Sequence, residues 1–180
     1  MSSAWWLGNH CMLGLAATLQ TTLNLLRTKQ CVLNLASDNM ASAVNVLAKT
    51  TGSKEVQSAG EQNGSLWFKR RNGYEHVSDK FTHSGLKPIH SSLIRPSRIA
   101  DCPAQMEAES IAVHEMQQDV SSGALMALEV KIVRTHVHDA IRMAGYENRI
   151  DPDKWRPLIM SFQELYGLGE KVGKSEVGGN

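Results

Sequence analysis

The segment Gln20-Thr21-Thr22 has the residue types of an anion-binding site. Three leucines that follow it have helical spacing, which predicts a helix that begins at these threonines. The first turn of a helix presents unpaired backbone N–H groups and the positive end of the helix dipole, so two hydroxyls beside them suit a phosphate monoester. Plain N-capping of the helix by a threonine is the competing interpretation.

Two adjacent tryptophans, Trp5 and Trp6, follow directly after Ser2 and Ser3. Chain ends are usually frayed and polar, so two large aromatic side chains at this place require a packing partner or a ligand. Hydroxyl groups beside an indole ring suit a ligand that has both a flat ring and an anionic tail. Together with the threonine segment, these residues indicate a binding site for such a ligand.

His136-Val137-His138 places two imidazoles on one face of a predicted strand, and Glu129 precedes them on that strand. Pairs of histidines at this spacing bind metals in some β-barrels, so a metal-dependent oxidoreductase is one alternative. The other interpretation has one imidazole packed or hydrogen-bonded and the other solvated. The remaining histidines show no ligand spacing, and we therefore assign no metal ligands.

The basic run Lys69-Arg70-Arg71 lies in a stretch, residues 50–75, that is rich in Gly, Ser, Gln and Asn. This composition predicts a long exposed loop with Trp67-Phe68 as a local anchor. Solvation is the favoured interpretation of the basic run, and a phosphate partner is the less favoured one.

The composition is that of an ordinary soluble domain. A length of 180 residues predicts a single domain over 1–180, and 42% apolar and 21% charged residues are typical of globular proteins. A net charge of +1 gives no electrostatic reason for binding nucleic acid or an anionic membrane, and no apolar run is long enough to span a bilayer. Three widely spaced cysteines and no signal peptide predict a reducing, cytoplasmic location.

The elements that must position these residues are mostly strands. Apolar runs and alternation predict strands at residues 11–17, 31–35, 104–109 and 125–138. Helical signals follow Thr22 and Ser37-Asp38 and recur at residues 79–85 and 151–165, and a flexible tail is expected at 168–180. The apolar phase of the last strand changes at Ile132-Val133, which predicts a β-bulge. Non-sequential strands with inserted helices predict a mainly β fold with α decoration, as in a β-barrel.

Several blocks of the sequence, taken in order, can be compared with a known family. They are residues 2–6, 20–25, 31–38, 79–86, 100–108, 129–137 and 149–158. This series resembles the flavin reductase-like family, the flavoredoxin-type proteins with an FMN-binding split β-barrel. The resemblance runs over nearly the whole chain.

The resemblance implies a homodimer that holds FMN non-covalently near the subunit interface. It implies hydride transfer from NAD(P)H to the flavin, with reduced flavin or electrons passing to a partner monooxygenase or a small acceptor. The implied FMN contacts are Trp5 at the isoalloxazine, Ser2 and Ser3 at its edge or the ribityl chain, Thr21, Thr22 and Lys80 at the phosphate, and His136 and Tyr166 elsewhere in the pocket. No residue is assigned a proton-transfer role, because the cofactor carries the hydride chemistry.

One departure from the family concerns the start of the chain. Family members usually begin with a further strand and a loop that ends in an asparagine just before the position of Met1. We therefore expect the first barrel strand to be absent and its neighbour to expose an edge. A truncated, non-catalytic barrel with weak or no FMN binding is the alternative function that follows.

Overall fold

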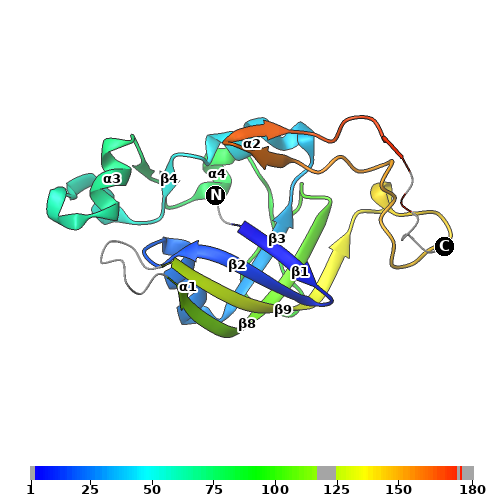
Figure 1. The fold of residues 1–180 in the computed structure, drawn as a ribbon, viewed down its shortest axis with the longest axis horizontal. Coiled ribbons are helices and arrows are strands. Elements are labelled where there is room, and N and C mark those ends of the chain that lie inside the picture. Colours follow the sequence, from blue (N-terminus) through cyan, green and yellow to red (C-terminus); the bar gives the residue numbers. More distant parts are fainter. Residues whose placement is uncertain (1–2, 117–124, 174, 176–180) are drawn as a thin grey trace.

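The computed structural model of the chain describes residues 3–116, 125–173 and 175. Its main element is a five-stranded antiparallel sheet with the strand order β1-β2-β9-β8-β3 (Figure 1). The strands are β1 (Ser3–Leu7), β2 (His10–Ala16), β3 (Gln30–Leu35), β8 (Ala104–Met116) and β9 (Leu125–Val137). The mainly β fold that the sequence predicts is confirmed.

Short helices and small sheets decorate the main sheet. The α-helices are α1 (Gln20–Thr28), α2 (Ala41–Val46), α3 (Ser65–Arg71) and α4 (Lys80–Ser84). The 3₁₀ helices are η1 (Asp38–Met40), η2 (Lys54–Ser58), η3 (Glu61–Asn63) and η4 (Asp139–Ile141). The two-stranded sheets are β4 (Thr50–Thr51) with β5 (Glu75–His76), β6 (Pro88–Ile89) with β7 (Arg98–Ile99), and β10 (Ile159–Ser161) with β11 (Glu164–Tyr166).

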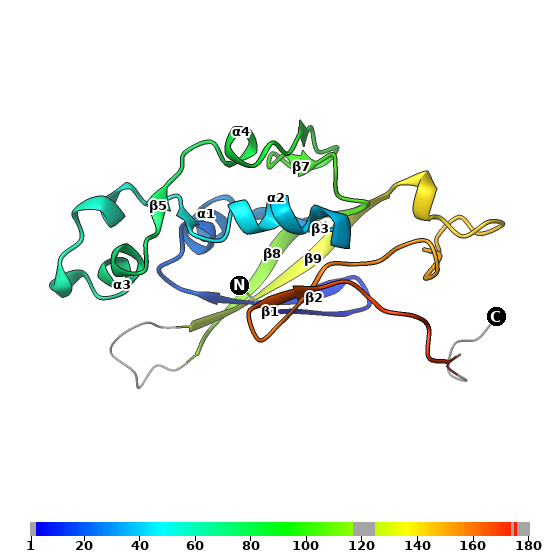
Figure 2. The same cartoon turned by 90° about the horizontal axis from the view of Figure 1, so that it is seen from above.

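The helices are unevenly distributed around the main sheet. Figure 2 shows α1, α2 and α4 on one side of β1 and β2, and both views place α3 at one end of the molecule, beyond β4 and β5. No helix in the described part of the chain is long and apolar enough to cross a membrane.

The hydrophobic core lies between one face of the sheet and α1. Cys11, Leu13 and Leu15 alternate along β2 and are buried, as expected where successive side chains of a strand point to opposite faces. Leu25 of α1 and Leu128 of β9 belong to the same buried cluster. The fold therefore fixes the orientation of α1, and with it the threonine segment at its start.

The predicted β-bulge is present in β9. Glu107 of β8 pairs with Arg134 whereas Ala108 pairs with Ile132, so Val133 is an extra residue in β9. An extra residue moves all later side chains of a strand to the opposite face. Beyond the bulge, His136 therefore shares a face with Glu107.

The ends of the short helices follow the sequence only in part. Asp79 caps α4 by accepting from the backbone N–H groups of Phe81 and Thr82, and Gly85 ends it with a φ of 71°, as predicted. The predicted threonine cap of α1 is not made, because the N-cap position is Leu19 and has no side-chain hydrogen bond.

The stretch 50–75 is not the long loop that its composition predicts. It contains β4, η2, η3, α3 and β5. Val56 and Ala59 are buried beneath α3, and Nη1 of Arg70 donates to the carbonyl oxygen of Ala59 over 2.9 Å. The polar composition of residues 50–75 did not predict these helices and strands, because only a few apolar residues pack among them.

The helix predicted at residues 151–165 is also wrong, because this region forms the β10–β11 hairpin. Pro157 cannot donate a helical hydrogen bond, and the N–H of Leu158 bonds to the carbonyl oxygen of Ala36 at the end of β3 over 2.9 Å. Phe162 and Gln163 form the turn with φ angles of 47° and 69°. The described part of the predicted tail, residues 168–173 and 175, has no regular secondary structure.

Candidate functional site

A cavity of about 740 Å³ lies where the first turn of α1 meets β4, β5, α3 and α4. The residues that line it with polar or charged side chains include Gln20, Thr21, Asn24, Thr50, Thr51, Lys54, Glu55, Lys69, His76, Asp79 and Lys80. Two of the predicted phosphate ligands, Thr21 and Lys80, thus come together from distant parts of the sequence. The N-terminal end of α1, with the positive end of its dipole, borders the same cavity.

The two adjacent threonines have different environments. Thr22 is completely buried, and its hydroxyl donates to the carbonyl oxygen of Ala16 over 2.7 Å. This bond fastens the start of α1 to the end of β2. Thr21 is exposed and lines the cavity, so its hydroxyl is the one available to a ligand there.

Lys80 is held at the cavity by its neighbours. The ammonium group of Lys80 donates to the hydroxyl of Thr50, which itself donates to the carbonyl oxygen of Leu47 over 2.9 Å. Burial lowers the pKa of Lys80, and the positive charge of Lys69 lowers it further. The ammonium group therefore lies in a setting where a negative charge would be stabilising.

Gly52 permits a close approach between β4 and α1. A Cβ atom at this position would lie 2.7 Å from Cγ and 3.1 Å from Cβ of Gln20. A side chain at Gly52 would displace the side chain of Gln20, which lines the cavity beside Thr21.

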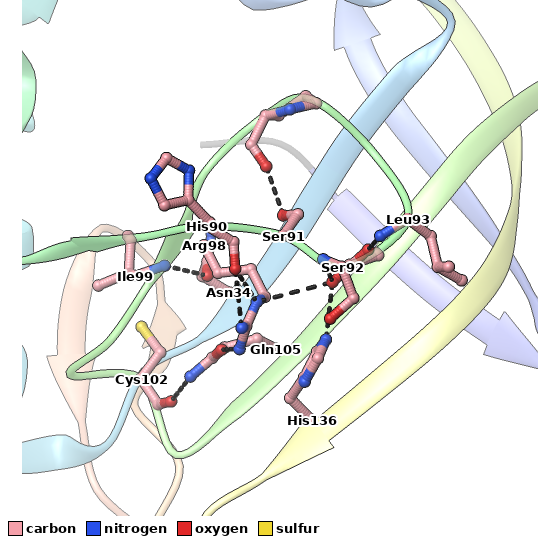
Figure 3. Close-up of polar contacts among 12 residues, drawn as sticks. Asn34, His90, Ser91, Ser92, Leu93, Arg98, Ile99, Cys102, Gln105 and His136 are labelled. Carbon is pink, nitrogen blue, oxygen red and sulfur yellow. Dashed lines mark hydrogen bonds and ion pairs between the residues drawn. The ribbon is translucent and has the colours of Figure 1, made fainter.

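His136 does not line this cavity and belongs to a separate buried polar network (Figure 3). Its Nε2 lies 2.7 Å from Oε1 of Glu107, a carboxylate with no exposed surface. The same carboxylate accepts from the backbone N–H groups of Ser92 and Leu93, each over 2.7 Å. Burial acts to raise the pKa of Glu107, but these two N–H groups and His136 together hold it below its usual value.

The network fastens the segment between β6 and β7 over strands β3 and β8. Arg98 donates to the carbonyl oxygen of His90 over 2.9 Å and to the side-chain oxygen of Gln105. The N–H of Ile99 donates to the side-chain oxygen of Asn34 over 2.9 Å. Figure 3 shows these contacts converging on one patch of the sheet.

His136 and Glu129, which the sequence places on one strand, have different side-chain partners. His136 bonds to Glu107, whereas Glu129 forms its contact with His10, whose Nδ1 lies 2.7 Å from its Oε1. Across residues 3–116, 125–173 and 175, no group of three or more His, Cys, Asp or Glu side chains is placed to hold a metal ion.

An apolar pocket of about 510 Å³ lies between β1, β3, α2 and the β10–β11 hairpin. Trp6, Val44, Trp155 and Leu165 are among the side chains that line it. The indole N–H of Trp155 donates to the hydroxyl of Ser37 over 3.1 Å, which ties this region to the end of β3.

The remaining predicted contacts that the structure describes do not line the cavity at the start of α1. Trp5 and Trp6 are adjacent in β1 and so point to opposite faces of the sheet, and 57% of the surface of Trp5 is exposed. Ser3 pairs with Gly14 near the end of β2, Ser2 lies outside the described residues, and Tyr166 is 54% exposed in β11.

Lys69, Thr50 and His76 line the cavity and were missed by the sequence analysis. The Thr50-Thr51-Gly52 segment gave a usable signal, because a glycine after two hydroxyl residues is typical of a tight approach to a ligand or helix. For Lys69 the signal was the basic run, for which a phosphate partner was the less favoured interpretation, and its place at the cavity depends on the unpredicted helix α3.

Comparison with known proteins identifies one relative and a set of similar structures. No family model matches the sequence. The chain is 31% identical over 175 residues to the uncharacterized protein YdfE of Bacillus subtilis, covering 97% of this chain and 78% of YdfE.

The similar solved structures have low sequence identity. The flavoredoxin from Methanosarcina acetivorans has a TM-score of 0.70 at 12% identity and covers 98% of this chain and 78% of its own. The flavoredoxin of Desulfovibrio vulgaris (Miyazaki F) has a TM-score of 0.67 at 16% identity, and the match covers 95% of this chain and 76% of the flavoredoxin. Nitrilotriacetate monooxygenase component B from Bacillus cereus has a TM-score of 0.65 at 16% identity, and the match covers 92% of this chain and 71% of that protein. These values show a common fold.

Proposed function

Because the chain belongs to one family with YdfE and shares the fold of the flavoredoxins, we propose that it is a flavin reductase-like split-barrel protein that binds FMN and catalyses hydride transfer from NAD(P)H to the flavin. The cavity at the start of α1 is the observation that carries this proposal. Thr21, Lys80 and the positive end of the α1 dipole meet there, and a phosphate monoester with a charge of about −2 at neutral pH complements them.

The ring end of the flavin is proposed to lie along β1. Ser3 is paired with Gly14, just before β2 leads into α1, so the start of β1 and the start of α1 lie at the same end of the sheet. The exposed indole of Trp5 offers a flat apolar surface for a ring. Ser2, His136 and Tyr166 complete the proposed pocket.

The residues of this chain are proposed to bind and orient the cofactor. The bound flavin would supply the two-electron chemistry. Thr21 and Lys80 would fix the phosphate, and the buried hydroxyl of Thr22 would hold the helix start in place without touching the ligand. The carboxylate of Glu107 would keep Nε2 of His136 in a hydrogen bond and so fix its ring.

The proposed assembly is a cytoplasmic homodimer. Trp5 and Leu7 of strand β1 are 57% and 75% exposed, and apolar side chains at an edge strand favour contact with a second surface. The three cysteines are free, as a reducing compartment would keep them. One similar structure is named as a monooxygenase component, which supports transfer of reduced flavin to a partner monooxygenase, with a small acceptor as the other recipient.

The visible absorption spectrum of the purified protein tests this proposal. We expect flavin bands that persist after FMN is added and the excess removed, and FMN-dependent oxidation of NADH or NADPH. A Thr21→Ala variant should retain less flavin with an unchanged circular dichroism spectrum. A folded protein that retains no flavin and oxidises neither nucleotide would contradict the proposal and favour a non-catalytic barrel.

A further inference from the structure

Lys69 reaches the proposed phosphate cavity from α3, the helix at the end of the molecule (Figures 1 and 2). The other two residues of the basic run point to different partners. Nη1 of Arg70 donates to the carbonyl oxygen of Ala59 over 2.9 Å, and the guanidinium of Arg71 lies 5.4 Å from the centre of the Trp67 ring. In this run Lys69 alone lines the cavity.

Helix α3 holds Lys69 in a defined place. The carbonyl oxygen of Lys69 accepts from the N–H of Tyr74 over 3.0 Å, which ties the end of the helix to the approach to β5. The N–H of Glu75 in turn donates to the carbonyl oxygen of Lys49, just before β4. Lys69 and the strand that carries Thr50 therefore belong to one hydrogen-bonded unit.

Lys69 and Lys80 line the same cavity, and neither forms an ion pair with a carboxylate of the described residues. The lysine ion pairs among those residues are made by Lys154 and Lys171. Burial lowers the pKa of Lys69, and the pKa of Lys80 falls through burial and through the charge of Lys69. Two ammonium groups in a partly buried cavity repel each other unless an anion joins them.

The acidic side chains at the cavity are engaged elsewhere. A carboxylate oxygen of Glu55 accepts from the hydroxyl of Ser53. Asp79 accepts from the N–H groups of Phe81 and Thr82 as the cap of α4. Three lysines (Lys54, Lys69 and Lys80) and these two carboxylates line the cavity, so its lysines exceed its carboxylates by one.

We propose that Lys69 is a second cationic ligand of the flavin phosphate, and that the Lys69–Lys80 pair makes the protein select phosphorylated flavins over riboflavin. This inference rests on the proposed flavin function. Two ammonium groups match the charge of about −2 on a phosphate monoester, and the diphosphate of FAD carries the same charge over two phosphorus atoms. The shared chemistry is a flavin-linked phosphate.

Equilibrium binding of FMN, FAD and riboflavin to three variants tests this inference. Lys69→Gln removes the charge at similar length, Lys69→Arg keeps the charge, and Lys49→Gln is the matched control because Lys49 is exposed and does not line the cavity. We expect Lys69→Gln to raise the Kd for FMN about tenfold. The Kd for riboflavin should stay unchanged, and Lys69→Arg and Lys49→Gln should bind FMN within about twofold of the wild type.

The outcomes separate the inference from the function on which it rests. A larger rise in Kd for FAD than for FMN would identify the diphosphate as the ligand of the lysine pair, and the reverse would identify the monoester. Unchanged FMN affinity in Lys69→Gln, or an equal loss for riboflavin, would overturn the role of Lys69 while leaving flavin binding intact. Failure of the wild type to bind any of the three flavins would overturn both proposals.

Discussion

The Nε2 atom of His136 lies 2.7 Å from Oε1 of Glu107, and this contact connects the two longest strands of the sheet beneath the segment between β6 and β7. It depends on the bulge at Val133, since an uninterrupted β9 would turn His136 to the face of Ile132 and Ala108. Glu107 is thus a buried carboxylate whose position and partners are both set by the register of the sheet.

Replacing Glu107 with glutamine is expected to destabilise the protein by about 3 kcal/mol at pH 7. The neutral amide presents one oxygen where the carboxylate accepts from Ser92, Leu93 and His136, so buried donors lose their partners. Urea unfolding followed by circular dichroism measures the change. Glu109→Gln is the control on the same strand, because Glu109 is exposed, and it should change stability by less than about 0.5 kcal/mol.

The same carboxylate predicts part of the acid sensitivity. The pKa of Glu107 in the folded protein is below its usual value, so the unfolded chain binds the proton more tightly and stability falls as the solution is acidified. The contribution is fully present above the unfolded value of about 4.3 and is lost as the pH falls through the folded pKa. Glu107→Gln should therefore flatten the dependence of unfolding free energy on pH below about 5. If the unfolding free energy of the variant and of the wild type depended equally on pH below about 5, other carboxylates would account for the acid sensitivity.

Thr22→Val is expected to lower the free energy of unfolding by about 1–3 kcal/mol without changing FMN affinity by more than about twofold. The buried hydroxyl donates to the carbonyl oxygen of Ala16, and valine leaves that acceptor without its partner. Thr22→Ser keeps the donor and serves as the control. A stable Thr22→Val protein with weakened FMN binding would place the hydroxyl on the phosphate instead.

The parts of the fold that the sequence predicts are those with strong local signals. The apolar run at residues 11–17 identified strand β2, the apolar phase change located the bulge at Val133, and Asp79 with Gly85 bounded α4. Such signals need no knowledge of the partner element. The residue types of the threonine segment predicted a phosphate site, the family resemblance added Lys80 to it, and the structure brings Thr21 and Lys80 to the same cavity.

The parts that were missed depend on long-range contacts. Helix α3 is held by Val56 and Ala59, too few apolar residues to give a periodic pattern, so the position of Lys69 was not predictable. The β10–β11 hairpin turns at Phe162 and Gln163, which have positive φ without glycine. Residue type alone does not indicate a turn there, because that conformation disfavours bulky side chains.

Gly52→Ala is expected to weaken FMN binding severalfold and to cost about 1–3 kcal/mol of stability. The added Cβ would lie 2.7 Å from Cγ of Gln20, so the Gln20 side chain must shift in the first turn of α1, beside Thr21 in the cavity. The double variant Gly52→Ala with Gln20→Ala removes the nearest atom and should recover most of the affinity. Binding that stays weak in the double variant would show that the backbone at Gly52, rather than this contact, matters to the cavity.

The affinity for FMN is expected to rise between about pH 5 and 7 and to fall in the alkaline range. The rise follows the second ionisation of the phosphate, near pH 6. The fall begins below the usual lysine pKa, because burial lowers the pKa of Lys69, and burial with the charge of Lys69 lowers that of Lys80. A bound phosphate raises both values again, so affinity is lost as the pH passes through the pKa of the free protein. Measuring the Kd for FMN from pH 5.5 to 10 tests both the rise and the fall of affinity. Riboflavin is the control ligand, because its flavin ring ionises as that of FMN does but it carries no phosphate.

The variant Lys69→Gln tests whether Lys69 and Lys80 together cause the loss of FMN affinity at alkaline pH. Without the neighbouring charge the pKa of Lys80 should return toward its ordinary value, so FMN affinity, although lower, should persist to higher pH than in the wild type. Lys49→Gln should leave the pH of this loss unchanged, because Lys49 does not line the cavity. If the loss has the same midpoint pH in the wild type and Lys69→Gln, or if riboflavin shows it equally, the two lysines do not act together on the phosphate.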